Sequence, residues 1–298
     1  MLVRLGSHKV KEALTGWSLV LPSMALFAVF FLVPVAHAFW LSLHSWDLVT
    51  EPKWVGLAQY AELFGSSVFR EVLVNTAVYA GASVAATMGL GLGLAVLLNR
   101  KGAIFAALQG AIFTSYIVSW VGVSLLWIWL LDSEYGLVNH LLAPLGLGPV
   151  NWLGDPDVAL WSLVGVTVWK TVGYDMVIFL AGLQSIPEDL NEAAAIDGAG
   201  PWSRFRYVTL PQLAPTTLFL LITSMIMTFQ GFDVVRIMTQ GGPIHSTTIY
   251  VYYVYEQAFV AVRVGYASAA IAVFFAILMA ITVVQFRFFS AGRRGADA

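Results

Sequence analysis

The feature that most constrains this chain is a set of apolar runs, each long enough to cross a membrane. A helix needs roughly 20 apolar residues to cross about 30 Å of hydrocarbon, and six runs of the sequence meet this requirement. They are Trp17–Leu43, Val72–Leu98, Ala103–Leu131, Val158–Gln184, Leu213–Thr239 and Tyr266–Phe289. Backbone polar groups in lipid must be satisfied within their own segment, so each run is predicted to be helical. The expected fold is an all-α membrane protein with six transmembrane helices.

Composition limits the classes of protein that are compatible with this chain. Of its 298 residues, 59% are hydrophobic and 11% are charged, and the mean hydropathy is +0.80. Soluble proteins contain about a quarter charged residues, so this much apolar surface is expected to face lipid. A soluble enzyme, a nucleic-acid-binding protein and a secreted disulfide scaffold are therefore excluded. The lack of Cys also excludes disulfides, Cys-ligated zinc, iron–sulfur clusters and thiol catalysis.

Lysine and arginine are distributed unevenly between the two sides of the predicted bundle. Ten of them lie on one side, Arg4, Lys9, Lys11, Arg100, Lys101, Arg204, Arg206, Arg287, Arg293 and Arg294, and four on the other, Lys53, Arg70, Arg236 and Arg263. Cytoplasmic loops carry the excess of positive charge, so both termini are predicted to be cytoplasmic, as an even number of spans requires. The expected division is a cytoplasmic segment 1–16, a membrane domain 17–290 containing a cytoplasmic loop 185–211, and a cytoplasmic tail 291–298.

The N-terminus has one competing interpretation, a cleaved signal peptide. Ala36-His37-Ala38 has the small-residue pattern of a signal-peptidase site and follows an apolar stretch behind two lysines. The apolar region of a signal peptide runs about 7 to 15 residues, and this stretch is longer. An uncleaved first span is therefore favoured.

The loop 185–211 is unlike the apolar runs on either side of it. It holds six charged residues, Glu188, Asp189, Glu192, Asp197, Arg204 and Arg206. Pro187 followed by two acids is typical of a helix start, and Gly198 is typical of a helix end. A second short helix is expected over Trp202–Val208, ending before Pro211. These features alone fit either an element that docks a partner or a plain solvated loop.

The residue spacing within this loop resembles a family motif. Glu192-Ala193-Ala194, Gly198 and, after nine residues, Val208-Thr209-Leu210-Pro211 are similar to the EAA loop of binding-protein-dependent ATP-binding cassette importers, with Val208 in place of Ile. Further segments resemble the same family: Trp54–Tyr60, Gly91–Arg100, Ala181–Pro187, and Thr239–Pro243 with Ser246-Thr247-Thr248. The resemblance covers nearly the whole chain and points to the sugar and glycerol-phosphate branch, in the position of the maltose-type first permease subunit.

This resemblance implies a fold, a role and partners. The fold would be that of a type I importer permease in the plasma membrane of a bacterium or archaeon. The EAA loop would be the coupling helix, with Glu192, Ala193, Ala194, Asp197 and Gly198 as residues that dock into an ATPase. The implied partners are a homologous second permease, two ATP-binding cassette ATPase subunits and an external substrate-binding protein, besides the lipid bilayer. ATP and Mg would be bound by the ATPase, because this chain has no P-loop and is expected to bind no cofactor.

Two ionisable residues lie deep inside the fourth run, where charge is costly and usually faces a cavity or a partner. Lys170 and Asp175 are five residues apart, about 140° around a helix, so they cannot pair well with each other. Tyr174, Gln230 and Asp233 are the expected partners. An interhelical pair that only fixes packing remains an alternative to contact with the substrate.

The resemblance to maltose-type relatives adds further candidates for the substrate pathway. Motif alignment places cavity-facing positions at Trp169, Val172, Gly173 and Met176 in the fourth run, and at Ser224, Met227, Thr228 and Gly231 in the fifth, with Gln230 beside them. An indole can stack on a sugar ring, and hydroxyl groups can hydrogen-bond to it. Ordinary packing is the alternative for every one of these positions.

The chain also departs from its relatives in the third run, which usually carries an Arg and a Pro. Here the two positions are Gln109 and Ser115, and without the Pro the helix is expected to be locally straighter.

The predicted role is half of a translocation pathway for a carbohydrate. The same type of complex carrying glycerol-3-phosphate or a glycerophosphodiester is the alternative. A stand-alone ion-coupled transporter, with Lys170 and Asp175 as a proton relay, is more remote. A membrane-embedded enzyme lacks support, because the sequence offers neither a Ser–His–Asp set nor a metal-binding spacing.

Overall fold

The computed structural model describes residues 3–294, and it leaves undescribed the side chains of residues 1–11, 13 and 288–298. Outside this description lie five of the cations used to predict orientation, Arg4, Lys9, Lys11, Arg293 and Arg294, together with most of the expected tail 291–298. The chain forms two compact units, Met1–Gly65 with Val254–Phe275 and Ser66–Tyr253 with Ala276–Ala298. Each unit is described by itself.

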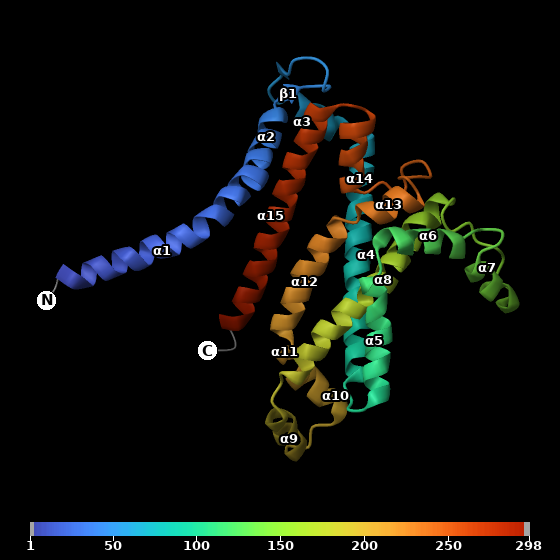
Figure 1. Cartoon of the computed structure of the whole chain (residues 1–298). Helices are drawn as coiled ribbons and strands as arrows, with labels where there is room; N and C mark the ends of the chain where they lie inside the picture. The colour runs from blue at the N-terminus through green and yellow to red at the C-terminus, as the bar shows by residue number, and fades with distance from the viewer. Residues whose placement is uncertain (1–2, 295–298) are drawn as a thin grey trace. The chain divides into compact units, whose positions relative to one another are not determined.

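The first unit contains the N-terminal span and an outer hairpin. Helix α1 (Val3–Phe27) runs through the π-helical turn η1 (Ala28–Leu32) into α2 (Val33–Leu41) (Figure 1). Strands β1 (His44–Ser45) and β2 (Lys53–Trp54) pair antiparallel, with His44 opposite Trp54, and α3 (Ala58–Gly65) follows. The π-helical turn η4 (Glu256–Val260) and the first part of α15 (Val264–Arg294) complete the unit, and Val264 N–H donates to the Trp46 carbonyl at 3.0 Å.

The second unit is a helical bundle built around the long helix α8 (Pro156–Gln184). Its elements are α4 (Ser67–Leu98), α5 (Ala103–Ile117), α6 (Trp120–Leu130), α7 (Leu137–Leu142), the 3₁₀ turn η2 (Ala143–Leu145), α8 (Pro156–Gln184), α9 (Glu188–Ile196), α10 (Pro201–Arg204), the π-helical turn η3 (Phe205–Thr209), α11 (Leu210–Gln212), α12 (Ala214–Phe229), α13 (Phe232–Met238) and most of α14 (Tyr250–Tyr255). Helix α8 packs along α4, α5 and α12 (Figure 1), so side chains from α8 can meet three other helices.

Local sequence signals account for where the long helices begin. Ser66 is the N-cap of α4, and its hydroxyl accepts a hydrogen bond from Phe69 N–H at 3.2 Å. Asp155 caps α8 in the same way, with Pro156 in the first turn, where its missing N–H has no cost. The core between α4, α8 and α12 consists of Ala95, Leu98, Met176, Phe179, Leu180 and Leu220.

Length and composition support the predicted count of six spans. Five helical segments are long and apolar enough to cross a membrane: Leu14–Leu41, Ser67–Leu98, Pro156–Gln184, Ala214–Met238 and Val264–Arg287. The number rises to six if the pair α5 and α6, whose two helices are bent by 98°, is counted as one span. The prediction of one unbroken helix over Ala103–Leu131 is therefore wrong. Helix α5 does continue through Ser115, and the break follows at Val118–Ser119.

The structure also corrects the cytoplasmic loop. The second short helix was expected to end before Pro211, but helical backbone continues over Pro201–Gln212. Pro211 lies near the C-terminal end of this run, directly after the π-helical turn η3.

Candidate coupling loop and transport site

The short helix α9 carries the residues predicted to dock an ATPase. Pro187 occupies its N-cap position, and Glu188 and Asp189 lie in the first turn, where the helix dipole favours acids. Glu192 and Ala193 are exposed and Ala194 is half-buried. Within the described residues Glu192 forms no ion pair, so its carboxylate is available to a partner.

A Schellman motif ends α9. Gly198 has φ +81° and donates its N–H to the Ala195 carbonyl at 3.1 Å, while Ala199 N–H reaches the Ala194 carbonyl at 2.9 Å. No atom would lie within 4 Å of a Cβ at Gly198. Gly198 is therefore required for the left-handed backbone conformation, and the space beside the helix at this position is open.

Large apolar side chains are exposed around this helix. Ile196 is 87% exposed, Trp202 is 74% exposed and Tyr207 is 76% exposed. Together with α9 they form a surface that mixes acids and apolar groups, which is the composition expected of an interface with another protein.

Lys170 is buried, and it bonds to backbone rather than to an acid. Its Nζ donates to the carbonyls of Ser115 at 3.3 Å, Tyr116 at 3.0 Å and Val118 at 2.6 Å. In the described part of the chain, the ammonium forms no hydrogen bond or ion pair with the expected partners Tyr174, Gln230 and Asp233. The reason for this correction is that α5 ends beside Lys170 and presents unpaired carbonyl groups there.

Asp175 is also buried, and its partner is a hydroxyl group. Ser224 Oγ on α12 donates to Asp175 Oδ1 at 3.2 Å, and the buried Oδ2 has no hydrogen-bond partner among the described residues. Thr228 Oγ1 donates to the Ser224 carbonyl at 2.7 Å. Three of the predicted pathway residues thus lie together between α8 and α12.

The remaining pathway candidates separate into buried and accessible sets. Met176 is fully buried in the core, and Gly173 lies against the backbone of α5. Gly231 stands in the break between α12 and α13, close to the Tyr79 hydroxyl. Trp169, Met227 and Gln230 are exposed and Val172 is half-buried, so these four are the more accessible set in this chain.

The segment Thr239–Thr248, part of the family resemblance, is a closed loop held by its own hydroxyl groups. Thr247 Oγ1 donates to the Gly242 carbonyl at 2.6 Å, and Thr248 Oγ1 donates to the Gly241 carbonyl at 3.0 Å. Asn75 Nδ2 on α4 donates to the His245 carbonyl at 2.9 Å. Sequence reasoning missed this role of Asn75, although a polar side chain near the end of an apolar run was the available signal.

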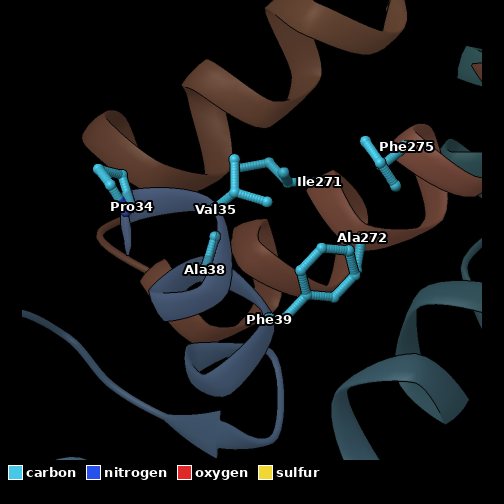
Figure 2. A pocket seen from close by; sticks show the side chains of 7 residues that line it. All are labelled: Pro34, Val35, Ala38, Phe39, Ile271, Ala272 and Phe275. Carbon is cyan, nitrogen blue, oxygen red and sulfur yellow. The ribbon is translucent and has the colours of Figure 1, made fainter. Parts of the chain in front are cut away.

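An apolar pocket of about 230 Å³ lies between α2 and α15 in the first unit. Figure 2 shows its lining, Pro34, Val35, Ala38, Phe39, Ile271, Ala272 and Phe275, with the Val35 and Ile271 side chains beside each other. The Phe39 and Phe275 rings meet edge to face, with centroids 5.8 Å apart. Because no polar side chain lines this pocket, it is unsuited to hydrogen-bond a sugar.

The chain is similar in sequence to known transport permeases. The family described as binding-protein-dependent transport system inner membrane component matches residues 87–295. The sn-glycerol-3-phosphate transport system permease protein UgpA of Yersinia pestis is 34% identical over 272 residues, which is 91% of this chain and 92% of the relative. The trehalose/maltose transport system permease protein MalF of Thermococcus litoralis is 36% identical over 241 residues, 80% of this chain and 82% of the relative.

Solved structures support the same fold. A chain of a bacterial ABC transporter involved in the import of the acidic polysaccharide alginate superposes with a TM-score of 0.83, at 24% sequence identity, over 97% of this chain and 99% of that chain. The family match covers more than two thirds of the sequence, and the two relatives are each more than 30% identical to it. These two findings assign the chain to its family. The chain belongs to the family of binding-protein-dependent transport system inner membrane components.

Proposed function

We propose that this chain forms half of the translocation pathway of an ATP-driven importer, and that the imported molecule is a carbohydrate. The observation that carries the proposal is the capped helix α9, which holds an exposed Glu192 beside open space at Gly198. A short helix that is closed by a Schellman motif can transmit a push as a rigid body.

The partners follow from this role. A homologous second permease would complete the pathway, and two ATPase subunits that bind ATP and Mg would grip α9. Both termini would then be cytoplasmic, on the side of the loop 185–211. A reporter fused to the C-terminus should give a cytoplasmic signal, and an external signal would contradict this orientation.

An external binding protein would dock on the opposite side of the membrane. A polar pocket of about 400 Å³ in the first unit is suited to that contact, and Trp46, Asp47, Lys53, Glu62 and Arg263 are among its lining residues. Beside it, Val49 at the tip of the 44–54 hairpin is 89% exposed. This combination of aromatic, charged and apolar groups fits a transient protein contact.

A neutral carbohydrate is favoured over a phosphate ester by the charge of the accessible pathway residues. Trp169, Val172, Met227 and Gln230 carry no cation. The one lysine in these spans, Lys170, already donates to three carbonyls. A phosphate would lack a cationic partner among these four accessible residues. The glycerol-3-phosphate alternative retains the support of the name of the 34% identical relative.

A paired glycine substitution tests the coupling role. Gly198→Trp should abolish uptake and the co-purification of an ATPase while leaving the chain in the membrane. Gly146→Trp is the matched control, because Gly146 is exposed, has φ +74° like the left-handed Gly198, and its added Cβ meets nothing within 4 Å. Glu192→Lys tests the same contact without backbone strain. Normal uptake in both loop variants would refute the coupling role.

The substrate class is tested with the importer in proteoliposomes. Competition of uptake by neutral disaccharides, with no effect of glycerol-3-phosphate, is the expected result. Competition by glycerol-3-phosphate alone would establish the alternative.

A further inference from the structure

The break between α5 and α6 interrupts an apolar stretch and leaves backbone groups without helical partners. Helix α5 ends at Ile117, α6 begins at Trp120, and the two are bent by 98°. The last carbonyls of a helix have no partner within the helix. Inside a bilayer an unpaired carbonyl is costly, so this break needs a donor from elsewhere in the fold.

Lys170 of α8 supplies that donor. Its ammonium has three N–H groups, and three carbonyls of the last turn and the break lie within hydrogen-bond distance, those of Ser115, Tyr116 and Val118. A cation at the C-terminus of a helix also interacts favourably with the helix dipole. The residue is 3% exposed, so the ammonium is used within the fold.

The first residue of α6 also contacts Lys170. The ammonium lies 5.0 Å from the centroid of the Trp120 ring and 5.7 Å from that of Tyr116. These are cation–π distances. One side chain therefore contacts the end of α5, the break and the start of α6.

A side chain of α5 also reaches the backbone of α8. Ser115 Oγ lies 2.9 Å from the Ile112 carbonyl of its own helix, 3.2 Å from the Trp169 carbonyl and 3.3 Å from the Lys170 carbonyl, and these three carbonyls share its one hydroxyl proton. One turn further along α8, Gly173 allows the two backbones to approach, since an added Cβ would lie 2.6 Å from the Ile112 carbonyl oxygen. The end of α5 and this turn of α8 are thus fixed to each other from both sides.

We propose that Lys170 is a positioning residue for transport, which holds the break between α5 and α6 at the angle that brings α6 against α13. Both α6 and α13 are short helices that follow a break in their span, and they pack on each other. Lys170 acts through α6, and it does not contact the transported molecule. The expected effect of Lys170 on transport rests on the proposed function, whereas its effect on the angle between α5 and α6 does not.

The test combines a distance measurement with uptake kinetics. The chain has no Cys, so spin labels can be placed at Leu108→Cys on α5 and Leu126→Cys on α6, which are 45% and 47% exposed. Lys170→Met should broaden the label-to-label distance distribution in the assembled importer. It should also lower the maximal uptake rate by about tenfold at unchanged KM, the change that corresponds to one lost charge-assisted hydrogen bond.

Two further variants separate this role from others. Lys170→Arg keeps several donors and should restore both the narrow distribution and most of the uptake. Lys101→Met, the same substitution at an exposed site before α5, should change neither. If Lys170→Met cannot be recovered, Lys170→Gln takes its place, because it lacks the charge and has fewer donors; its distribution should broaden less.

The results that overturn the proposal are specific. An unchanged distance distribution in Lys170→Met or Lys170→Gln refutes the positioning role. A change of KM or of substrate preference with an unchanged distribution assigns Lys170 to substrate contact. If the wild-type importer transports no carbohydrate, the proposed function fails, whereas the distance distribution still decides the role of Lys170.

Discussion

Gly173→Ala should separate two helices whose backbones touch. At this glycine of α8, an added Cβ would lie 2.6 Å from the Ile112 carbonyl oxygen and 2.9 Å from the Phe113 Cα. Carbon atoms in favourable contact are about 3.5 to 4.0 Å apart. Both neighbours are backbone atoms of α5, so no side-chain rotation can relieve the contact. The helices would have to move apart by roughly 1 Å, and this would stretch the bonds from Lys170 to the end of α5.

The size of the effect follows from two opposing contributions. Inserting a methyl group into a packed contact costs about 1–3 kcal/mol. Replacing Gly by Ala within a helix favours folding by up to about 1 kcal/mol. Gly165→Ala on the same helix isolates the second contribution, because Gly165 is exposed and an added Cβ there meets nothing within 4 Å. Gly173→Ala should therefore be less stable than Gly165→Ala by about 1–3 kcal/mol.

The measurement is the free energy of unfolding of both variants and the wild type in mixed micelles. Gly165→Ala should be as stable as the wild type or more stable, and Gly173→Ala less stable. Equal free energies for the two variants would show that α5 and α8 are further apart than this geometry requires. The close approach of the α5 and α8 backbones would then no longer help to hold the break beside Lys170.

Two substitutions and one change of pH test other parts of the chain. Gly241→Ala should lower the melting temperature, because Gly241 has φ +79° and a Cβ there would lie 2.6 Å from Thr248 Oγ1; an unchanged melting temperature would contradict that loop geometry. Asp175→Asn keeps an acceptor for Ser224, so its melting temperature should change little while substrate affinity or specificity changes; an unchanged substrate profile would favour a packing role. Hydrogen bonds from the Thr50 backbone and side chain and the Val49 backbone hold the pKa of Asp47 below its ordinary value of 3.8. The protection factors of the Val49 and Thr50 amides, which compare the observed exchange rate with the intrinsic rate at each pH, should therefore drop only as the pH falls through that lowered pKa.

The parts of the fold that depend on neighbouring residues could be predicted from the sequence. The apolar runs indicate the spans because the length of a membrane helix is a local property. The start of α9 is indicated by Pro187 and the two acids after it. Its end requires a residue with a left-handed backbone conformation, which Gly198 provides. Each of these features is decided within a few residues of the position that it affects.

The parts that depend on distant residues could not be predicted. The break at Val118–Ser119 is stabilised by Lys170, which is far along the chain, and nothing between Ala103 and Leu131 reveals that a donor will reach it. The partners of Lys170 were predicted wrongly for the same reason. A buried ammonium suggests an acid, but here the unpaired acceptors are backbone carbonyls whose position depends on where α5 ends.

The motif after the fifth span shows what a family resemblance encodes in this chain. Its threonines and glycines bond mostly to one another, and Asn75 joins the loop to α4, so these residues specify a loop shape. The exposed pathway candidates Trp169, Met227 and Gln230 lie outside every segment on which the resemblance rests. A loop closed by its own hydroxyl groups does not discriminate among substrates, whereas an accessible indole, thioether or amide can. Selectivity in this permease is therefore expected to change with substitutions at those accessible positions, and substitutions within the motif are expected to alter stability first.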